Sequence, residues 1–228
     1  NHMTRLDAIE IIMSELKEND LLISTTGMIS REVFHVRERD ANFYMIGSMG
    51  LASSFGLGIA MVNKNKRVIV LDGDGSLLMS LNTLTLPRFL GINNFVHICL
   101  DNGLYQSTGN QKTISPSLDF SEIAKSMGYK NYFSLQEDVN ELKNLIHELP
   151  ESLSFINIKV SEKQDVEVPR VSIDPEIISS RFSQKLTWMA TWFYCIDCCI
   201  IMCIFYCTYR WIWCYYIGTW CYLIPNFG

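Results

Sequence analysis

The sequence predicts a doubly wound α/β domain, in which a mainly parallel sheet carries helices on both faces. Three short, nearly continuous apolar runs support this, at residues 21–25, 67–72 and 95–102, and each is followed by turn-forming residues. Segments with the spacing and length of helices lie between and after these runs. Continuous apolar strands that alternate with helices are typical of a parallel sheet buried on both faces.

The first half of the chain is expected to begin with a helix over residues 4–19, because apolar side chains recur there at every third or fourth position. Thr4 is the expected N-cap of this helix. The strand at 21–25 comes next and ends in Thr26-Gly27. Segment 47–64 is apolar but rich in glycine and small residues, which predicts a helix packed closely against a flat surface.

The second half continues the alternation up to a short carboxyl-terminal helix. Gly91 is the expected end of one helix, because glycine often follows the last helical residue. The expected elements are a strand at 67–72, a helix at 76–91, a strand at 95–102, helices at 120–128 and 139–149, a strand at 153–161, and an extended segment with a short helix at 166–186.

Composition divides the chain into three parts. Residues 1–3 resemble the remnant of an expression tag, and residues 4–186 form the expected domain. All five tryptophans and seven of the eight cysteines lie after Leu186. We expect this anomalous apolar tail, residues 187–228, to be non-native. A membrane anchor and a metal or disulfide element stay open as alternatives, because residues 187–210 could span hydrocarbon as a helix, against the cost of burying Asp197.

Charge excludes some classes of function for the body of the chain. The formal net charge is −5, and no run of Lys and Arg exceeds two residues. Nucleic-acid backbones require clustered cations, so we expect no nucleic-acid partner. Arg5, Asp7 and Glu10 interrupt any apolar core of a signal peptide. We therefore expect a cytoplasmic protein whose body does not associate with membranes.

Polar residues follow two of the predicted strands at the points where these strands end. Asp72-Gly73-Asp74-Gly75-Ser76 follows one strand, and Asp101-Asn102-Gly103 follows the next. A strand-end Asp-Gly pair alone is often a simple turn with a capping carboxylate, and the glycine spacing does not fit the dinucleotide fingerprint. Neighbouring parallel strands would, however, bring Asp74 and Asn102 to one edge. A carboxylate and an amide oxygen suit Mg²⁺ when phosphate oxygens and water complete its shell. The backbone amides at the following helix start would hold the same anion.

Together, these motifs resemble those of a known enzyme family. GDGS followed by an asparagine at the next strand end resembles the diphosphate-binding signature of thiamine-diphosphate enzymes, and YMIGSMGLASSFGLGIA resembles the segment that holds the aminopyrimidine. With TTGMISRE, VIVLDGDGSLLM and LDNGLYQSTG, the chain is similar to the carboxyl-terminal half of phosphonopyruvate decarboxylases and to sulfopyruvate decarboxylase β subunits. The resemblance covers residues 4–186.

The resemblance implies a set of binding residues. Mg²⁺ would be bound by the side chains of Asp74 and Asn102 and by the carbonyl of Leu104. Gly47 would offer its carbonyl to the aminopyrimidine, and Met49 would be the apolar wedge that bends the cofactor. The other implied contacts to thiamine diphosphate are Thr26, Gly27, Gly73, Gly75 and Ser76.

The resemblance also implies an activity and a partner. The reaction would convert phosphonopyruvate to phosphonoacetaldehyde and CO₂, with sulfopyruvate as the alternative small anionic 2-oxo acid. The glutamate that activates the cofactor belongs to a pyrimidine-binding domain in this family, and these 228 residues leave no room for one. No catalytic residue is therefore assigned to this chain. We expect a partner α subunit and a symmetric α₂β₂ unit or a multiple of it.

Other classes and residues remain open. A cofactor-binding subunit without turnover of its own is one alternative. A subunit that passes electrons to iron–sulfur clusters would need several thiolates, but the body contains only Cys99. His97 is expected in the core, whereas His35 and Arg31 fit either a surface or a substrate role. Residues 106–113 are either a substrate lid or a solvated loop.

Overall fold

The computed structural model describes residues 3–161 and 168–186. The apolar tail and its alternative interpretations lie outside these ranges. No helix within them is long and apolar enough to cross a membrane.

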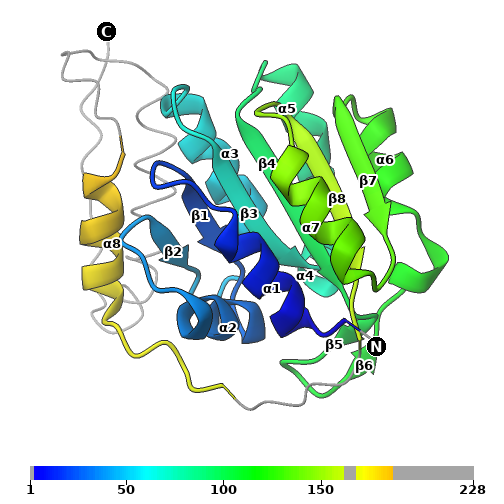
Figure 1. The fold of residues 1–228 in the computed structure, drawn as a ribbon, viewed down its shortest axis with the longest axis horizontal. Coiled ribbons are helices and arrows are strands. Elements are labelled where there is room, and N and C mark those ends of the chain that lie inside the picture. The colour runs from blue at the N-terminus through cyan, green and yellow to red at the C-terminus, as the bar shows by residue number, and fades with distance from the viewer. Residues whose placement is uncertain (1–2, 162–167, 187–228) are drawn as a thin grey trace, which may run out of the picture. The chain divides into compact units, whose positions relative to one another are not determined.

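A six-stranded parallel sheet forms the centre of the domain, in the order β2-β1-β3-β4-β8-β7 (Figure 1). Strand order reverses between β1 and β3, which makes this the switch point of a doubly wound sheet. The strands are β1 (Leu21–Ser24), β2 (Asn42–Tyr44), β3 (Val68–Gly73), β4 (Phe95–Asp101), β7 (Asn131–Leu135) and β8 (Ser154–Lys159), while β5 (Leu104–Tyr105) and β6 (Gln111–Lys112) form a separate antiparallel hairpin.

Helices cover both faces of the sheet. In Figure 1, α1 and α7 lie in front of the sheet, while α3 and α6 lie behind it. The expected fold class is therefore confirmed. The helices are α1 (Arg5–Ser14), α2 (Met28–Val36), α3 (Ala52–Val62), α4 (Asp74–Met79), α5 (Leu86–Phe89), α6 (Phe120–Ser126), α7 (Val139–Glu148) and α8 (Pro175–Gln184), with 3-10 turns η1 (Leu81–Thr85) and η2 (Ser115–Ser117).

The first helix begins where the sequence predicts it. Thr4 Oγ1 accepts a hydrogen bond from the Asp7 N–H at 3.1 Å, and the Asp7 carboxylate accepts one from the Thr4 N–H at 2.8 Å, so the two form a capping box. The helix ends at Ser14, earlier than expected, because the Asp20 carboxylate accepts from the Lys17 N–H at 2.8 Å and holds the chain in a turn.

The helix expected at 76–91 is divided into α4, η1 and α5. Ser80 leaves helical geometry at φ −135°, and its carbonyl accepts from the Thr83 hydroxyl at 2.8 Å. Pro87 then forms the first turn of α5. Gly91 ends the segment with φ 65°, as predicted. Side-chain hydrogen bonding and proline thus divide a segment whose apolar periodicity predicts one helix.

Elements α2, β2 and β7 were not predicted from the sequence, and neither were the β5–β6 hairpin and η2. The α2–β2 segment is interrupted by the charged residues 37–40, which obscure its periodicity. Strands β2 and β7 are short edge strands. Elements of this kind carry weak sequence signals.

Helix α3 starts at Ala52, not at residue 47. Gly47, Ser48 and Gly50 have φ values of 73°, 54° and 91°, which are incompatible with a right-handed helix. The rest of the expectation is confirmed, because α3 packs very closely on the sheet. A Cβ atom at Gly56 would lie 2.3 Å from Val70 Cγ2.

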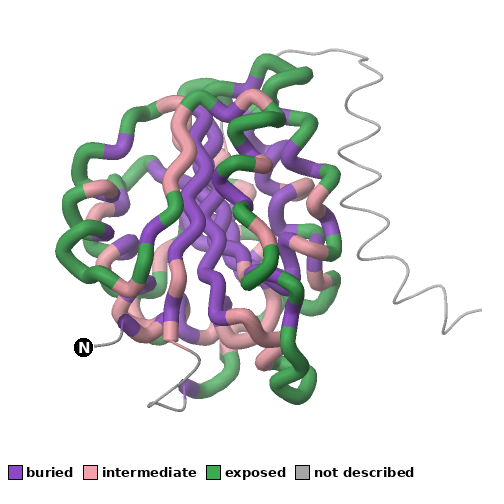
Figure 2. Tube along the Cα trace, turned by 90° about the vertical axis from the view of Figure 1, so that its right-hand side faces the viewer, coloured by how far each residue is buried: buried purple, intermediate pink, exposed green. Residues whose placement is uncertain are grey.

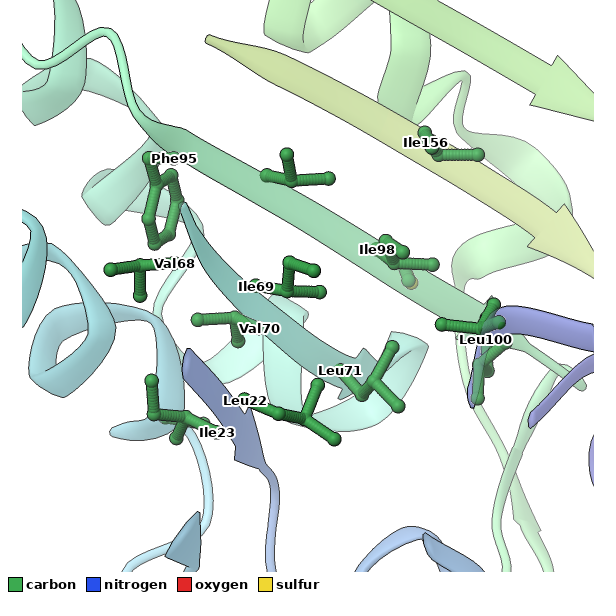
Figure 3. Close-up of a cluster of buried hydrophobic side chains, with 14 of the residues drawn as sticks. Leu22, Ile23, Val68, Ile69, Val70, Leu71, Phe95, Ile98, Leu100 and Ile156 are labelled. Carbon is green, nitrogen blue, oxygen red and sulfur yellow. The ribbon is translucent and has the colours of Figure 1, made fainter. Parts of the chain in front are cut away.

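The core lies between the sheet and its two helical layers (Figure 2). Apolar side chains of β1, β3 and β4 fill its centre, as Figure 3 shows for Ile23, Val70 and Ile98. Met3 is also buried, and its carbonyl accepts from the Ser161 N–H at 2.9 Å. Met3 therefore packs as part of the domain, although the sequence groups it with the tag remnant.

The contact between Gly56 and Val70 gives a stability test. We expect Gly56→Ala to lower the free energy of unfolding, because overpacking of about 1–3 kcal/mol exceeds the gain in helix propensity of about 1 kcal/mol. Gly58→Ala in the same helix is the matched control. A Cβ there meets no atom within 4 Å, so this variant should be at least as stable as the unsubstituted chain. Urea unfolding measures both, and equal stability of the two variants would contradict the close packing.

Candidate functional site

A pocket lies at the carboxyl edge of the sheet, where β1, β3 and β4 end. Thr25 follows β1, Gly73 ends β3 and Asn102 follows β4, so the pocket spans the switch point. Ligands of doubly wound sheets bind at this position. The remaining wall residues are Arg5, Thr26, Met28, Ile29, Met49, Asp74, Gly75, Ser76, Leu100, Leu104, Tyr105, Gln106 and Ser107.

The two aspartates at the end of β3 have different environments. Asp72 is fully buried, and its Oδ2 atom lies 3.2 Å from His97 Nε2. Its other oxygen accepts from the Gly73 N–H at 3.0 Å. Asp72 is thus held by internal partners and does not line the pocket, and His97 is a core residue, as expected. Asp74, two residues later, does line the pocket.

The Asp74 carboxylate occupies an unfavourable position for a negative charge. It is 2% exposed, and the Thr113 hydroxyl donates to its Oδ2 atom at 2.6 Å. Burial raises the pKa of Asp74, the neighbouring Asp101 raises it further, and the Thr113 hydrogen bond only partly opposes this. A cation beside Asp74 would relieve both the desolvation and the repulsion.

Asn102 presents a defined amide to the same pocket. Its Oδ1 atom accepts from the Leu104 N–H at 3.1 Å, and its Nδ2 group donates to Gln106 Oε1 at 3.4 Å. The same Gln106 oxygen accepts from Arg5 Nη1 at 2.5 Å. Both hydrogen-bonded partners of the Asn102 amide thus come from the short loop that follows it.

Asp101 holds the turn that places Asn102. Its Oδ1 atom accepts from the Ser115 hydroxyl at 2.6 Å and from the Gly103 N–H at 3.1 Å, and its Oδ2 atom pairs with Lys159. The Gly103 carbonyl in turn accepts from the Thr113 N–H at 2.8 Å. This network closes the loop at its base, so the loop that carries Asn102 also places the Thr113 hydroxyl on Asp74.

Gly75 occupies a position that no other residue fits in this arrangement. A Cβ there would lie 2.5 Å from ring atoms of Tyr105 and 3.4 Å from Met49 Cε. The start of α4, at Gly73, has no side-chain cap. Bare backbone at a helix start is a surface on which a phosphate can be bound closely.

Ser76 connects three segments through its hydroxyl. The hydroxyl lies 2.9 Å from Thr25 Oγ1 and accepts from the Gly50 N–H at 3.1 Å. Thr26 makes a similar connection, because its Oγ1 atom accepts from the Gly47 N–H at 3.0 Å. The loop expected to hold the aminopyrimidine is therefore fastened to the ends of β1 and β3. Because the Ser76 hydroxyl is already engaged, Ser76 would contact an anion through its backbone N–H.

The pocket brings together most of the residues singled out from the sequence. Gly27 and Gly47 do not line it, although Thr26 and Met28 on either side of Gly27 do, and Arg31 and the exposed His35 are also outside it. The expected residues that line the pocket are Thr26, Met49, Gly73, Asp74, Gly75, Ser76, Asn102 and Leu104. Their roles in binding remain predictions.

Sequence reasoning missed other wall residues, chiefly Arg5, Thr25 and Tyr105. Thr25 and Tyr105 adjoin the quoted motifs and could have been included from them. Arg5 lies far from every motif in sequence, and only the packing of α1 brings it to the site. In the 106–113 loop, Gln106 and Ser107 line the pocket, whereas residues 108–112 are exposed.

The oxygen donors of this pocket fit a magnesium–diphosphate group. Within residues 3–161 and 168–186, no three His, Cys, Asp or Glu side chains gather as a ready-made metal site. The oxygen ligands expected from the sequence belong to Asp74, Asn102 and Leu104, and all three residues line the pocket. Mg²⁺ accepts such a sparse set, because it usually retains water and phosphate ligands.

Comparison with known proteins identifies the family of the chain. Residues 23–158 match the family described as "Thiamine pyrophosphate enzyme, C-terminal TPP binding domain". The sulfopyruvate decarboxylase β subunit of Methanocaldococcus jannaschii is 38% identical over 185 residues, which cover 80% of this chain and 96% of that protein.

Two further relatives are longer proteins. The phosphonopyruvate decarboxylase of Streptomyces viridochromogenes is 42% identical over 127 residues, which cover 56% of this chain and 32% of that enzyme. Among solved structures, benzoylformate decarboxylase from Polynucleobacter necessarius superposes with a TM-score of 0.57 at 19% identity, over 73% of this chain and 34% of that chain. The last match supports the fold alone.

The raised pKa of Asp74 predicts that the free energy of unfolding depends on pH through this carboxyl group. Because the folded chain holds the Asp74 proton more tightly than the unfolded chain does, the stability from this group is present at low pH and is lost as the pH rises through the folded pKa. In chelator, Asp74→Asn should therefore raise the free energy of unfolding at pH 7. The difference in free energy of unfolding between the variant and the unsubstituted chain should shrink as the pH falls toward 3.8, the ordinary pKa of an aspartate side chain.

Urea unfolding across this pH range measures the effect. Asp119→Asn is the control, because hydrogen bonds from Ser121 and Glu122 lower the pKa of Asp119, so its pH dependence should have the opposite sign. A less stable Asp74→Asn variant at pH 7 would show that burial does not penalise the Asp74 charge.

Proposed function

Because this chain belongs to the thiamine pyrophosphate enzyme family and carries its carboxyl-terminal cofactor-binding domain, we propose that it is one subunit of a thiamine-diphosphate-dependent 2-oxo-acid decarboxylase. The observation that carries the proposal is that Asp74, Asn102 and the uncapped start of α4 line the same pocket. Two relatives at 38% and 42% identity, one of similar length and one longer, are named as decarboxylases.

We assign the metal and diphosphate contacts to this chain. Mg²⁺ would be held by Asp74, Asn102 and the Leu104 carbonyl, and the diphosphate by the backbone at Gly75 and Ser76. When bound, thiamine diphosphate would supply the electron sink for the bonding electron pair that stays behind when CO₂ leaves. The roles of this chain are to bind the cofactor and orient it.

Met49 and its flanking backbone would hold the organic part of the cofactor. Gly47, Ser48 and Gly50 adopt positive φ angles, and hydrogen bonds to Thr26 and Ser76 fix the loop. These hydrogen bonds give the loop a defined shape on which the cofactor could be held.

A second polypeptide would complete the active site. We propose that a pyrimidine-domain α subunit supplies the activating glutamate and the facing wall of the cleft. The name "subunit beta" of the relatives that this chain covers almost end to end supports such a partner. An α₂β₂ unit, or a multiple of it, would satisfy closed symmetry. We place this enzyme in the cytoplasm.

The substrate would be a small 2-oxo acid with an anionic head group. Phosphonopyruvate is the first candidate, supported by 42% identity to phosphonopyruvate decarboxylases, and the products would be phosphonoacetaldehyde and CO₂. Sulfopyruvate is the second candidate, supported by the match in length with the β subunits of sulfopyruvate decarboxylases. A cofactor-binding subunit without turnover is the alternative of another class.

Reconstitution tests the proposal. Mixing this chain with a separately expressed pyrimidine-domain subunit should create decarboxylase activity that neither possesses alone, because each supplies part of one site. The assay measures aldehyde release from phosphonopyruvate, with sulfopyruvate and pyruvate run in parallel. Turnover by the single chain would contradict the shared site. A mixture that binds thiamine diphosphate tightly but releases no aldehyde from any of the three acids would favour the subunit without turnover.

A further inference from the structure

A buried ion pair lies beside the pocket and has no assigned role. Arg5, in the first turn of α1, donates from Nε and Nη2 to the two carboxylate oxygens of Glu32 in α2, both at 2.7 Å. The two side chains are 9% and 1% exposed. A bidentate, buried pair of this kind fixes the guanidinium plane, because every change in its angle breaks a charged hydrogen bond.

The remaining arm of this guanidinium reaches the pocket loop. Arg5 Nη1 donates to Gln106 Oε1 at 2.5 Å, a contact between residues 101 positions apart. Arginine has only donors, so the Gln106 amide must turn its oxygen toward it. The cation therefore determines which end of the Gln106 amide faces Arg5.

The same oxygen then determines the orientation of Asn102. Gln106 Oε1 also accepts from Asn102 Nδ2 at 3.4 Å. An oxygen cannot donate, so the Asn102 amide must present its NH₂ group to Gln106. Its Oδ1 atom is left for other partners. That oxygen accepts from the Leu104 N–H at 3.1 Å and retains a second lone pair.

We propose that Arg5, held by Glu32, is a positioning residue that acts through Gln106 to set the polarity of the Asn102 amide, so that its oxygen and not its nitrogen is available to a cation. The inference rests on the proposed function, because the cation in question is the Mg²⁺ of the cofactor site. Without this relay, the Leu104 N–H still favours the oxygen, but the amide turns more readily to present N–H donors to the metal.

A purely structural role for the ion pair predicts a different result. In that case, Arg5 and Glu32 only tie α1 to α2, and Gln106 is dispensable. Replacing Arg5 would not separate the two roles, because it removes a charged partner of the buried Glu32 carboxylate and endangers the fold. Gln106→Leu is the better variant, because it removes the relay and leaves the ion pair in place.

The test measures Mn²⁺ affinity in the presence of thiamine diphosphate, by calorimetry on the enzyme assembled with its pyrimidine-domain subunit. Gln106→Leu should weaken Mn²⁺ binding by about 10- to 100-fold, the usual loss for a residue that orients a ligand. Gln106→Glu keeps an oxygen acceptor for Arg5 and Asn102, and so should bind at least as tightly as the unsubstituted enzyme. Thermal unfolding should be the same for all variants.

Two substitutions of the exposed Gln111, in the same loop but outside the pocket, are the matched controls. Gln111→Leu should leave Mn²⁺ affinity unchanged, and Gln111→Glu measures the effect of an added charge. Unchanged affinity in Gln106→Leu, or equal losses in Gln106→Leu and Gln111→Leu, would overturn the proposal.

A second readout does not depend on the metal. In the full-length chain without metal, the Asn102 Nδ2 signal in a ¹⁵N NMR spectrum should shift in Gln106→Leu and stay in place in Gln111→Leu. If the unsubstituted enzyme shows no metal-dependent cofactor binding, the proposed function fails, and this signal then decides the amide polarity alone. An Asn102 signal that does not shift in Gln106→Leu would overturn the relay.

Discussion

The parallel pairing of β3 with β4 is the constraint on which the site depends. Its register sets Gly73 opposite Leu100, so the residues that follow each strand, Asp74 and Asn102, line one pocket. A slip of one residue would turn the side chains of a strand to the opposite face. The apolar strands on either side, buried on both faces, resist such a slip. The hydrophobic core therefore determines where the polar site forms (Figure 3).

The site itself concentrates polar groups that reduce stability. Asp72 and Asp101 are almost fully buried, but each is held by hydrogen-bonding or charged partners from the fold. Asp74 is different, because its burial raises its pKa and the hydrogen bonds from Thr113, the Gly75 backbone and Ser115 only partly oppose this. A buried acidic group with a raised pKa in a pocket is typical of a functional site. Folding of the domain tolerates this cost because the parallel sheet buries a large apolar core.

The parallel sheet and both strand-end motifs were predicted from the sequence, because they depend on local periodicity and on residues adjacent to strands. The sequence could not predict that Arg5 lines the pocket, because this depends on the packing of α1 beside α2. The prediction also extended α3 back over Gly47 and Gly50, since apolar composition does not reveal positive φ angles. The division of the helix at Ser80 depends on a side-chain hydrogen bond that periodicity cannot report. The features that local sequence patterns did not predict are thus those that depend on tertiary contacts or on the handedness of the backbone.

The proposed function requires Asp74 to hold the cofactor through a divalent cation. Calorimetric titration of thiamine diphosphate into the assembled enzyme measures this, with Mg²⁺, with excess chelator, and with the Asp74→Ala variant. Tight binding should require Mg²⁺ and collapse in Asp74→Ala, because one of two proposed side-chain ligands is lost, while circular dichroism shows an unchanged fold. Equal cofactor affinity in the variant, or in chelator, would show that Asp74 does not hold the cofactor through a metal.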